Sequence, residues 1–231
     1  MTLGCWSSMF ALNKLFLRAL ISQHTKLSRS HLTPELQLHL ITDECHLWKA
    51  NLDNCIFDDP FWAFYWPGGQ ALTRYILDNP VLFKNRRVLD IGSGCGSAAI
   101  ASHLVGASQV VANDIDTVAS VAIELNVEKN GADVQISSEN LLEDSPRTQC
   151  DIVLFGDMFY DQDFSHLITH WIMKLPYKTT VLFGDPGRLP FLNHPLKSVL
   201  QNVARYDLPT TCQLENNGLT HADVWKYIVA K

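Results

Sequence analysis

A short glycine-rich loop limits the fold of this chain more than any other feature. Residues 88–96 read VLDIGSGCG, in which an apolar run leads into Gly92, Gly94 and Gly96. A helical pattern begins at Ser97, so the segment predicts a strand, a tight turn and a helix. Glycine permits backbone angles that other residues avoid, and it lets a ligand approach the main chain closely. We therefore expect a ligand-binding loop at one edge of an α/β sheet.

The spacing of the glycines and the nearby acids indicate the kind of ligand. Dinucleotide enzymes use G-x-G-x-x-G to hold a diphosphate, whereas this chain has G-x-G-x-G preceded by Asp90. A carboxylate beside the loop favours a cationic amine or sulfonium over a diphosphate. Asp114 ends the next predicted strand, where a carboxylate can accept hydrogen bonds from both hydroxyls of a ribose. Asp116 is expected to cap the helix that follows.

Beyond the loop, short apolar runs alternate with helical stretches to the end of the chain. This alternation is typical of a doubly wound, largely parallel sheet in one α/β domain. We expect strands at residues 88–91, 109–112, 134–136, 152–155, 181–183 and 224–229. We expect helices at residues 70–78, 97–104, 117–129, 164–174 and 195–203. A further helix is expected to begin at Thr33 and Pro34.

Composition argues against several classes of partner. The chain has 18 basic and 24 acidic residues, a net charge of −6, whereas proteins that bind nucleic acid usually present a basic surface. No run of about 18 apolar residues occurs, so no membrane span is expected. The six cysteines are scattered without a C-x-x-C pair, which indicates neither a metal site nor a disulfide framework. We therefore expect no nucleic acid, no membrane and no metal.

The N-terminal segment differs in charge from the rest of the chain. Four basic residues precede the first acidic one, Glu35, and the other fourteen face all twenty-four acids, a net charge of −10. Apolar residues recur at near-helical spacing over residues 9–21, and serines are frequent. These properties are typical of a mitochondrial transit peptide, with an ordinary surface helix as the alternative. We expect a leader over 1–31, a location in the mitochondrial matrix, and a domain over 32–231 that includes an N-terminal extension of about 32–85.

The glycine loop carries a resemblance to a known family. Residues 90–96, DIGSGCG, together with Asp114, resemble the first two motifs of the class I, seven-strand S-adenosylmethionine-dependent methyltransferases. The resemblance implies S-adenosylmethionine as the cofactor, with its amino-acid half on the loop and its ribose at Asp114. It also implies a seven-strand Rossmann-like sheet, mostly parallel, whose last strand runs antiparallel. The cofactor-binding residues that it implies in these two motifs are Asp90, Gly92, Ser93, Gly94, Gly96 and Asp114.

A second polar group follows the strand expected at 152–155. Residues 156–161 read GDMFYD, which places Asp157 and Tyr160 beyond the carboxyl end of that strand, where α/β sheets bind their ligands. Methyl transfer to an amine requires alignment and a deprotonated nitrogen, and these two side chains could hold and aim the amine. Asp157 would raise the pKa of that amine, and desolvation would lower it. The alternative is that Asp157 caps a helix and Tyr160 packs.

The D-x-x-Y pattern of Asp157 and Tyr160 resembles the motif after the fourth strand in the family-16 group of seven-strand protein lysine methyltransferases. The group also carries a Trp-Pro segment upstream of the glycine loop, matched here by residues 65–72, YWPGGQAL. The resemblance implies that Trp66 lies against the cofactor, although an aromatic residue before a Pro-Gly-Gly turn more often belongs to the core. Asn140 occupies the position that usually contacts the adenine, where many methyltransferases carry an acid.

Longer segments resemble those members of the group that methylate lysines of the electron transfer flavoprotein beta subunit. The matching segments are residues 32–38, 65–72, 112–116, 156–161, 184–188 and 215–220. They imply a protein-lysine N-methyltransferase that acts on this subunit. A methyltransferase of another protein or of a small amine, a nicotinamide-dependent oxidoreductase and a non-catalytic flavoprotein-binding partner are the alternatives. Asp185 and Arg188 fall at the same sheet edge, either in a substrate channel or in a surface turn.

Overall fold

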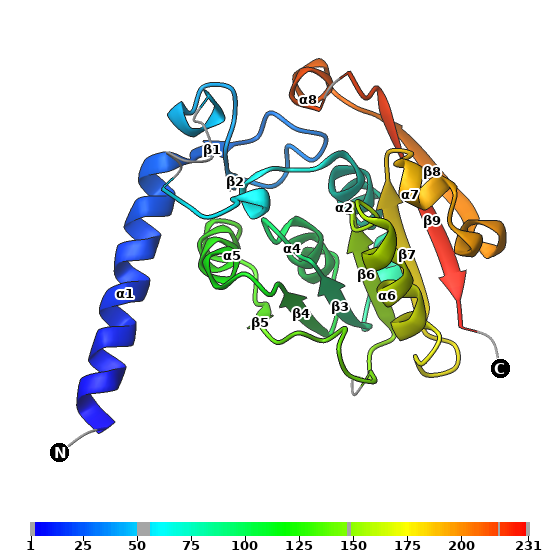
Figure 1. Cartoon of the computed structure of the whole chain (residues 1–231), viewed down its shortest axis with the longest axis horizontal. Coiled ribbons are helices and arrows are strands. Elements are labelled where there is room, and N and C mark those ends of the chain that lie inside the picture. The colour runs from blue at the N-terminus through cyan, green and yellow to red at the C-terminus, as the bar shows by residue number, and fades with distance from the viewer. Residues whose placement is uncertain (1–2, 50–55, 147–148, 217, 230–231) are drawn as a thin grey trace.

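The computed structural model describes residues 3–49, 56–146, 149–216 and 218–229, with side chains from residue 13 onward. A seven-stranded sheet, in the order β5-β4-β3-β6-β7-β9-β8, forms the centre of the molecule (Figure 1). Strands β5 to β7 pair in parallel, and β9 runs antiparallel to both of its neighbours, β7 and β8. The predicted sheet and its antiparallel last strand are therefore confirmed.

The strands of this sheet are β3 (Arg87–Ile91), β4 (Gln109–Asn113), β5 (Gln135–Ser137), β6 (Ile152–Gly156), β7 (Thr180–Asp185), β8 (Gln201–Asp207) and β9 (His221–Ile228). The helices along the domain are α2 (Pro67–Asp78), α3 (Pro80–Phe83), α4 (Ser97–Leu104), α5 (Thr117–Lys129), α6 (Gln162–Ile172), α7 (Leu189–Leu192) and α8 (Thr210–Glu215). Short 3₁₀ turns are η1 (His46–Lys49), η3 (Phe61–Ala63) and η4 (Pro195–Val199). The predicted helices at 97–104 and 117–129 match α4 and α5 to the residue.

Two apolar layers cover the sheet. Leu154 of β6 packs in the layer formed with α2 and α4, while its neighbours Val153 and Phe155 pack in the layer formed with α6 and α7. All three side chains are buried, because successive strand residues point to opposite faces and both faces are covered. This burial explains why the central strands read as continuous apolar runs, and it leaves the carboxyl edge of the sheet for polar side chains.

Two predicted helices are wrong. The helix expected over 195–203 is the short turn η4 followed by β8, an edge strand that pairs with β9. Proline starts a helical turn there, but the half-exposed residues of β8 find hydrogen-bond partners along β9. The helix expected to begin at Thr33 is a turn followed by β2 (Leu38–Leu40), whose residues are all buried against β1 and the domain. In both cases tertiary pairing outweighs local helix signals.

The N-terminal segment packs on α5. It consists of α1 (Leu3–His24) and β1 (Lys26–Ser28), which pairs antiparallel with β2. Ile21 is fully buried in a cluster that includes residues of α5, and Lys14 forms an ion pair with Glu124 at 2.6 Å. The Asn126 side chain of α5 accepts a hydrogen bond from the backbone of β2. Part of the segment predicted as a leader thus contacts the domain, and its boundary at residue 31 stays a prediction.

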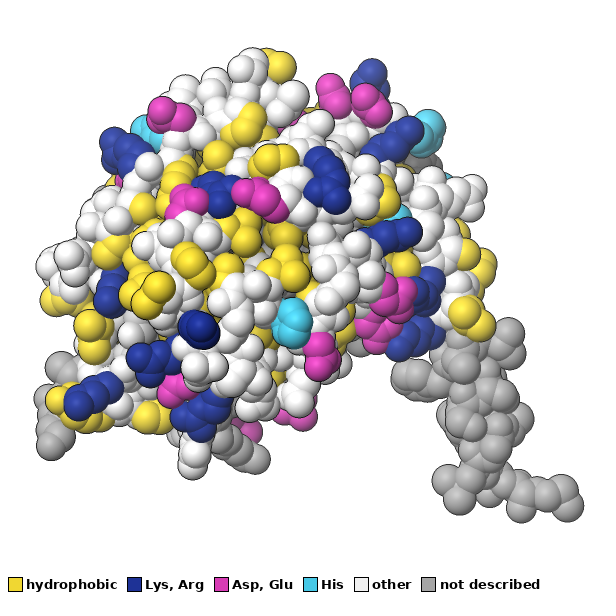
Figure 2. Space-filling model, turned by 180° about the vertical axis from the view of Figure 1, so that it is seen from behind, with side chains coloured by type: hydrophobic (Ala, Val, Ile, Leu, Met, Phe, Trp, Pro, Cys, Tyr) yellow, Lys and Arg dark blue, Asp and Glu magenta, His cyan; other side chains and the backbone are white. Residues whose placement is uncertain are grey.

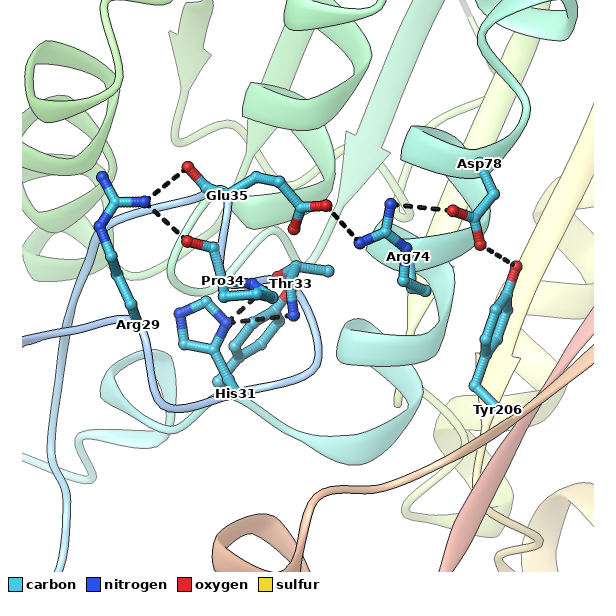
Figure 3. Close-up of polar contacts among 9 residues, drawn as sticks. Arg29, His31, Thr33, Pro34, Glu35, Arg74, Asp78 and Tyr206 are labelled. Carbon is cyan, nitrogen blue, oxygen red and sulfur yellow. Dashed lines mark hydrogen bonds and ion pairs between the residues drawn. The ribbon is translucent and has the colours of Figure 1, made fainter.

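A polar network joins the loop over residues 29–35 to α2 and β8 (Figure 3). Arg29 donates to the carbonyl oxygens of Pro34 and Glu35, and the Glu35 carboxylate pairs with Arg74 of α2 at 2.6 Å. Arg74 also pairs with Asp78, which accepts a hydrogen bond from the Tyr206 hydroxyl. These contacts hold α2 against the edge of the sheet and so position its N-terminal turn.

The far side of the molecule has no large area of one charge. Seen from behind, basic, acidic and apolar side chains are interspersed on the surface (Figure 2). No helix within the described part of the chain is long and apolar enough to cross a membrane.

Candidate functional site

The glycine loop joins β3 to α4 and is shaped by positive backbone angles. Gly92, Gly94 and Gly96 have φ of 66°, 55° and 80°, in the left-handed region that favours glycine. The Gly94 amide donates to the Asp114 carboxylate at 2.8 Å, so the end of β4 holds the loop in place. A Cβ on Gly96 would lie 3.0 Å from Ile123, which is closer than α5 tolerates without a shift. The loop conformation therefore depends on both glycine and packing.

Three of the predicted cofactor residues lie within the framework of the loop and do not line the cavity beside it: Asp90, Ser93 and Gly96. Asp90 is 2 % exposed, and it accepts a hydrogen bond from the Ser93 hydroxyl at 2.5 Å. Burial raises the pKa of the Asp90 carboxyl to about 7. These three residues stabilise the loop without lining the cavity. That they contact a cofactor stays a prediction.

A cavity of about 500 Å³ opens at the carboxyl ends of β3, β4 and β6. Open α/β sheets bind their ligands at this edge. The predicted residues that line it are Trp66, Gly92, Gly94, Asp114, Asn140, Asp157 and Tyr160. The fold thus brings together seven of the ten predicted site residues, although they come from segments almost a hundred positions apart. We refer to this space as the glycine-loop cavity.

Asp114 and Asn140 lie at the ends of β4 and β5 respectively. The Asp114 carboxylate accepts hydrogen bonds from the amides of Gly94 and Asp116, and burial raises its pKa. Asp116 accepts from the Val118 amide at 2.7 Å, which confirms that it caps α5. The Asn140 side chain donates to Glu143 at 2.8 Å. A carboxylate and an amide therefore follow two neighbouring strands, and β3 lies between these strands and β6, which Asp157 follows.

Asp157 is buried at the end of β6, with 6 % of its surface exposed. One carboxylate oxygen accepts from Arg188 Nε at 2.5 Å, and the other accepts from the Gly68 amide in the first turn of α2. Desolvation still raises the pKa of Asp157, although the Arg188 charge and the amides oppose the rise. Asp157 thus does cap a helix, but this helix is α2, whereas Asp161 caps α6.

Tyr160 lies on the outer part of the same cavity. Its side chain is 59 % exposed, and its ring stacks on Phe164 with the centroids 5.1 Å apart. Burial of part of the ring raises the pKa of the phenol. Asp157 therefore forms the inner wall and Tyr160 the rim, so a group that enters from solvent passes the phenol before it reaches the carboxylate.

The turn after β7 presents Arg188 to this cavity. One Asp185 oxygen accepts from the amides of Gly187 and Arg188 at 2.7 and 2.8 Å, which fixes the turn. The other oxygen is buried without a hydrogen bond, and burial together with the charge of Asp157 raises the pKa of Asp185 to about 7. The Arg188 guanidinium also lies 5.7 Å from the centre of the Trp66 ring. Arg188 is thus held between Asp157 and Trp66.

The cavity has further walls that the sequence analysis did not single out. Phe61, Trp62, Ile115 and Met158 all line it. Trp62 and Phe61 belong to the aromatic run before α2, and Ile115 lies between the two aspartates after β4. The aromatic run and the hydrophobic residue beside Asp114 were visible signals, but neither indicates a ligand contact without the fold.

A second cavity of about 580 Å³ adjoins the first, and Trp66 and Arg188 line both of them. Its other walls come from β1 and the loop after it, from the segment after β2, and from α8 and the turn that follows. We call this second space the extension cleft, because residues of the N-terminal extension form one side of it. No sequence pattern predicted it, since its two sides lie far apart along the chain.

The described part of the chain has no cluster of metal-ligating side chains, and its described cysteine side chains are free thiols. No group of three or more His, Cys, Asp or Glu side chains in that part is arranged to hold a metal ion. Cys45, Cys95, Cys150 and Cys212 are buried thiols. The side chains of Cys5 and Cys55 lie outside the described part. The polar groups of the glycine-loop cavity are therefore amides, carboxylates, a phenol and a guanidinium.

Comparison with known proteins identifies the relatives of this chain. The family model of the ribosomal protein L11 methyltransferase (PrmA) matches residues 71–156. The electron transfer flavoprotein beta subunit lysine methyltransferase of Rattus norvegicus is 42 % identical over 226 residues, which cover 96 % of this chain and 88 % of the rat protein. The protein of the same name from Homo sapiens is 44 % identical over 215 residues, covering 91 % of this chain and 82 % of the human one.

Solved structures show the same fold. The ribosomal protein L11 methylase of Lactobacillus delbrueckii superposes with a TM-score of 0.52 at 22 % identity, covering 89 % of this chain and 98 % of that one. The magnesium protoporphyrin IX methyltransferase of Synechocystis, solved with bound SAM, superposes with a TM-score of 0.52 at 14 % identity, covering 71 % of this chain and 80 % of that one. At these identities the likeness concerns the fold alone.

Proposed function

The chain belongs to the family of the electron transfer flavoprotein beta subunit lysine methyltransferases, and from this premise we propose its cofactor, its substrate and its location. The cofactor is S-adenosylmethionine, and the substrate is one or more lysine side chains of the electron transfer flavoprotein beta subunit. The enzyme acts in the mitochondrial matrix. The observation that carries the proposal is that the glycine loop, Asp114, Asp157 and Tyr160 line one cavity.

The residues of the glycine-loop cavity fit a cationic nucleoside. Four aspartates line it, and Arg188 is the only basic residue among the described side chains on its walls. Such a balance of charge attracts a sulfonium. The amides of the glycine loop, the Asp114 carboxylate and Asn140 would hold the amino-acid, ribose and adenine parts in turn. When bound, S-adenosylmethionine supplies the electrophilic methyl group.

The lysine is received by the rim and the inner wall of the same cavity. Tyr160 stands where the side chain enters, and Asp157 lies deeper, beside Arg188 and the N-terminal turn of α2. A lysine must lose a proton before its nitrogen can attack, and desolvation inside the cavity lowers its pKa. The carboxylate of Asp157 accepts a hydrogen bond from the amine and aims its lone pair. The released proton passes to water.

The N-terminal segment supports the proposed location. It is basic and free of acids up to residue 34, and its helical pattern corresponds to α1. Fusion of residues 1–31 to a fluorescent protein tests the point. Colocalisation with a matrix marker is expected, and a diffuse cytosolic signal would reject the location.

Intact-mass analysis tests the substrate. The purified flavoprotein beta subunit is incubated with the enzyme and S-adenosylmethionine, and mass increases in multiples of one CH₂ unit are expected. Methyl label found only in small molecules of a mitochondrial extract would instead identify a small-amine methyltransferase. A subunit that binds the chain but gains no mass would indicate a non-catalytic partner.

A further inference from the structure

The extension cleft offers a surface next to the site of reaction. Trp66 and Arg188 separate it from the glycine-loop cavity, and both side chains line both spaces. A lysine of a protein arrives with its main chain and its neighbouring side chains, which need a surface of their own beside the cofactor. In Figure 1 the segment around β1 and helix α8 lie on the same side of the molecule, above α2. The cleft between them adjoins the glycine-loop cavity, which the reactive amine would enter.

Carboxylates without a cationic partner face one another across this cleft. Asp43 and Glu44 follow β2 on one side, and Glu215 ends α8 on the other. Burial raises the pKa of Glu215, and the negative charge of Asp43 raises it further, so the two carboxylates lie within electrostatic reach. Among the ion pairs and hydrogen bonds of the described residues, none involves the side chain of Asp43, Glu44 or Glu215.

The basic residues of the cleft do not neutralise these carboxylates. Arg188 pairs with Asp157, and Arg29 donates to the carbonyl oxygens of Pro34 and Glu35. Lys26, on β1, is exposed and forms no ion pair within the described residues. Glu215 is half-buried near the like charge of Asp43, which costs free energy that a bound cation would recover. The cleft therefore complements a positively charged side chain.

We propose that the extension cleft binds the segment of the protein substrate that flanks the methylated lysine, and that Asp43 and Glu215 receive a basic side chain of that segment. This inference rests on the proposed function, because it assumes a protein as the methyl acceptor. The target lysine then enters the glycine-loop cavity past Tyr160, beside Trp66 and Arg188, which line both spaces. A small-amine substrate would have no use for the carboxylates of the cleft.

Steady-state kinetics with the full-length enzyme and the intact flavoprotein subunit test the inference. In the double variant Asp43→Asn/Glu215→Gln, the KM for the protein substrate is expected to rise about 2- to 5-fold, the upper part of the range for an exposed ion pair. The value of kcat and the affinity for S-adenosylhomocysteine, measured by calorimetry, should stay within about twofold because the cofactor residues are untouched. The KM of the wild type should also rise more steeply with salt than that of the variant.

The charge-reversal variant Asp43→Lys should raise this KM further, and Asp133→Asn serves as the matched control. Asp133 is an exposed acid that precedes β5, at the opposite edge of the sheet, so its loss should leave the KM unchanged. A KM within twofold of the wild type in both cleft variants, with unaltered salt dependence, would overturn the inference while the proposed function stands. If the wild-type enzyme fails to methylate the subunit although it binds S-adenosylhomocysteine, the proposed function and this inference fall together.

Discussion

Arg188 donates from Nε to the buried carboxylate of Asp157 at 2.5 Å, while its guanidinium lies 5.7 Å from the centre of the Trp66 ring. A buried carboxylate is costly unless it is paired, and here it is paired with Arg188 and with the N-terminal turn of α2. The same arginine forms part of the wall between the glycine-loop cavity and the extension cleft. The pairing therefore links the charge state of Asp157 to the position of a side chain that both spaces share.

Replacement of Asp157 tests its assigned role. In Asp157→Asn the side chain keeps its shape but loses the charge that holds the amine, so kcat should fall about 100-fold or more. The affinity for S-adenosylhomocysteine should stay within a few-fold, since Asp157 follows β6 and Asp114 follows β4, on the other side of β3. Single-turnover kinetics and calorimetry measure the two quantities. Turnover equal to that of the wild type would remove Asp157 from the catalytic step.

Replacement of Asp114 should mainly weaken the binding of the cofactor. Its carboxylate holds the Gly94 amide and faces the proposed ribose, so Asp114→Asn should weaken S-adenosylhomocysteine binding about 10- to 100-fold, the range for hydrogen bonds to a charged group. Calorimetry measures the change, and a thermal melt of the same sample reports whether the fold is retained. An affinity within twofold of the wild type, in a folded variant, would show that the ribose is held elsewhere.

The two glycines at the start of α2 should respond in opposite ways to alanine. A Cβ on Gly68 would lie 2.2 Å from the carbonyl oxygen of Gly184, whereas the nearest atom to a Cβ on Gly69 is 3.8 Å away. Gly68→Ala should lower the free energy of unfolding by about 1–3 kcal/mol or more, because the backbone of β7 must shift. Gly69→Ala should be neutral or stabilise by up to about 1 kcal/mol through helix propensity. Chemical denaturation measures both, and equal effects would contradict the close contact of α2 with β7.

The raised pKa of Asp185 predicts a pH-dependent stability. Its carboxyl titrates near 7 in the folded chain and near 3.8 when unfolded, so the folded state binds more protons between these values. Ionisation of Asp185 consequently lowers the stability of the wild type as the pH rises from about 4 to about 7, and this contribution is absent from Asp185→Asn. The melting temperature of the variant should exceed that of the wild type by a few degrees at pH 8.

The difference in melting temperature should shrink as the pH falls from 7 towards 3.8 and below, because Asp185 becomes protonated in the unfolded chain as well as in the folded one. Asp133→Asn, at an exposed acid, should show no such trend and serves as the control. A variant that melts below the wild type at pH 8 would mean that the ionised Asp185 stabilises the turn before Arg188.

Local sequence patterns were sufficient to predict the glycine loop and the helices and strands that flank it. Helices α4 and α5 begin and end where the sequence predicts, because glycine and Asp116 caps mark their starts and glycines follow their ends. The strands around them are continuous apolar runs, which the two covering layers require. The resemblance of the D-x-x-Y and glycine motifs to known methyltransferases was likewise carried by contiguous residues.

Only the tertiary structure decided which of several locally possible states each remaining segment takes. Residues 201–207 and 38–40 become strands because β9 and β1 supply their backbone partners, and no local signal encodes a partner distant in the chain. The ion pair of Asp157 with Arg188 and the extension cleft likewise join residues from separate segments. Sequence determined the short-range structure and the chemistry available at the sheet edge, whereas long-range packing set the contacts of each group, because burial and charge pairing exist only once the chain has folded.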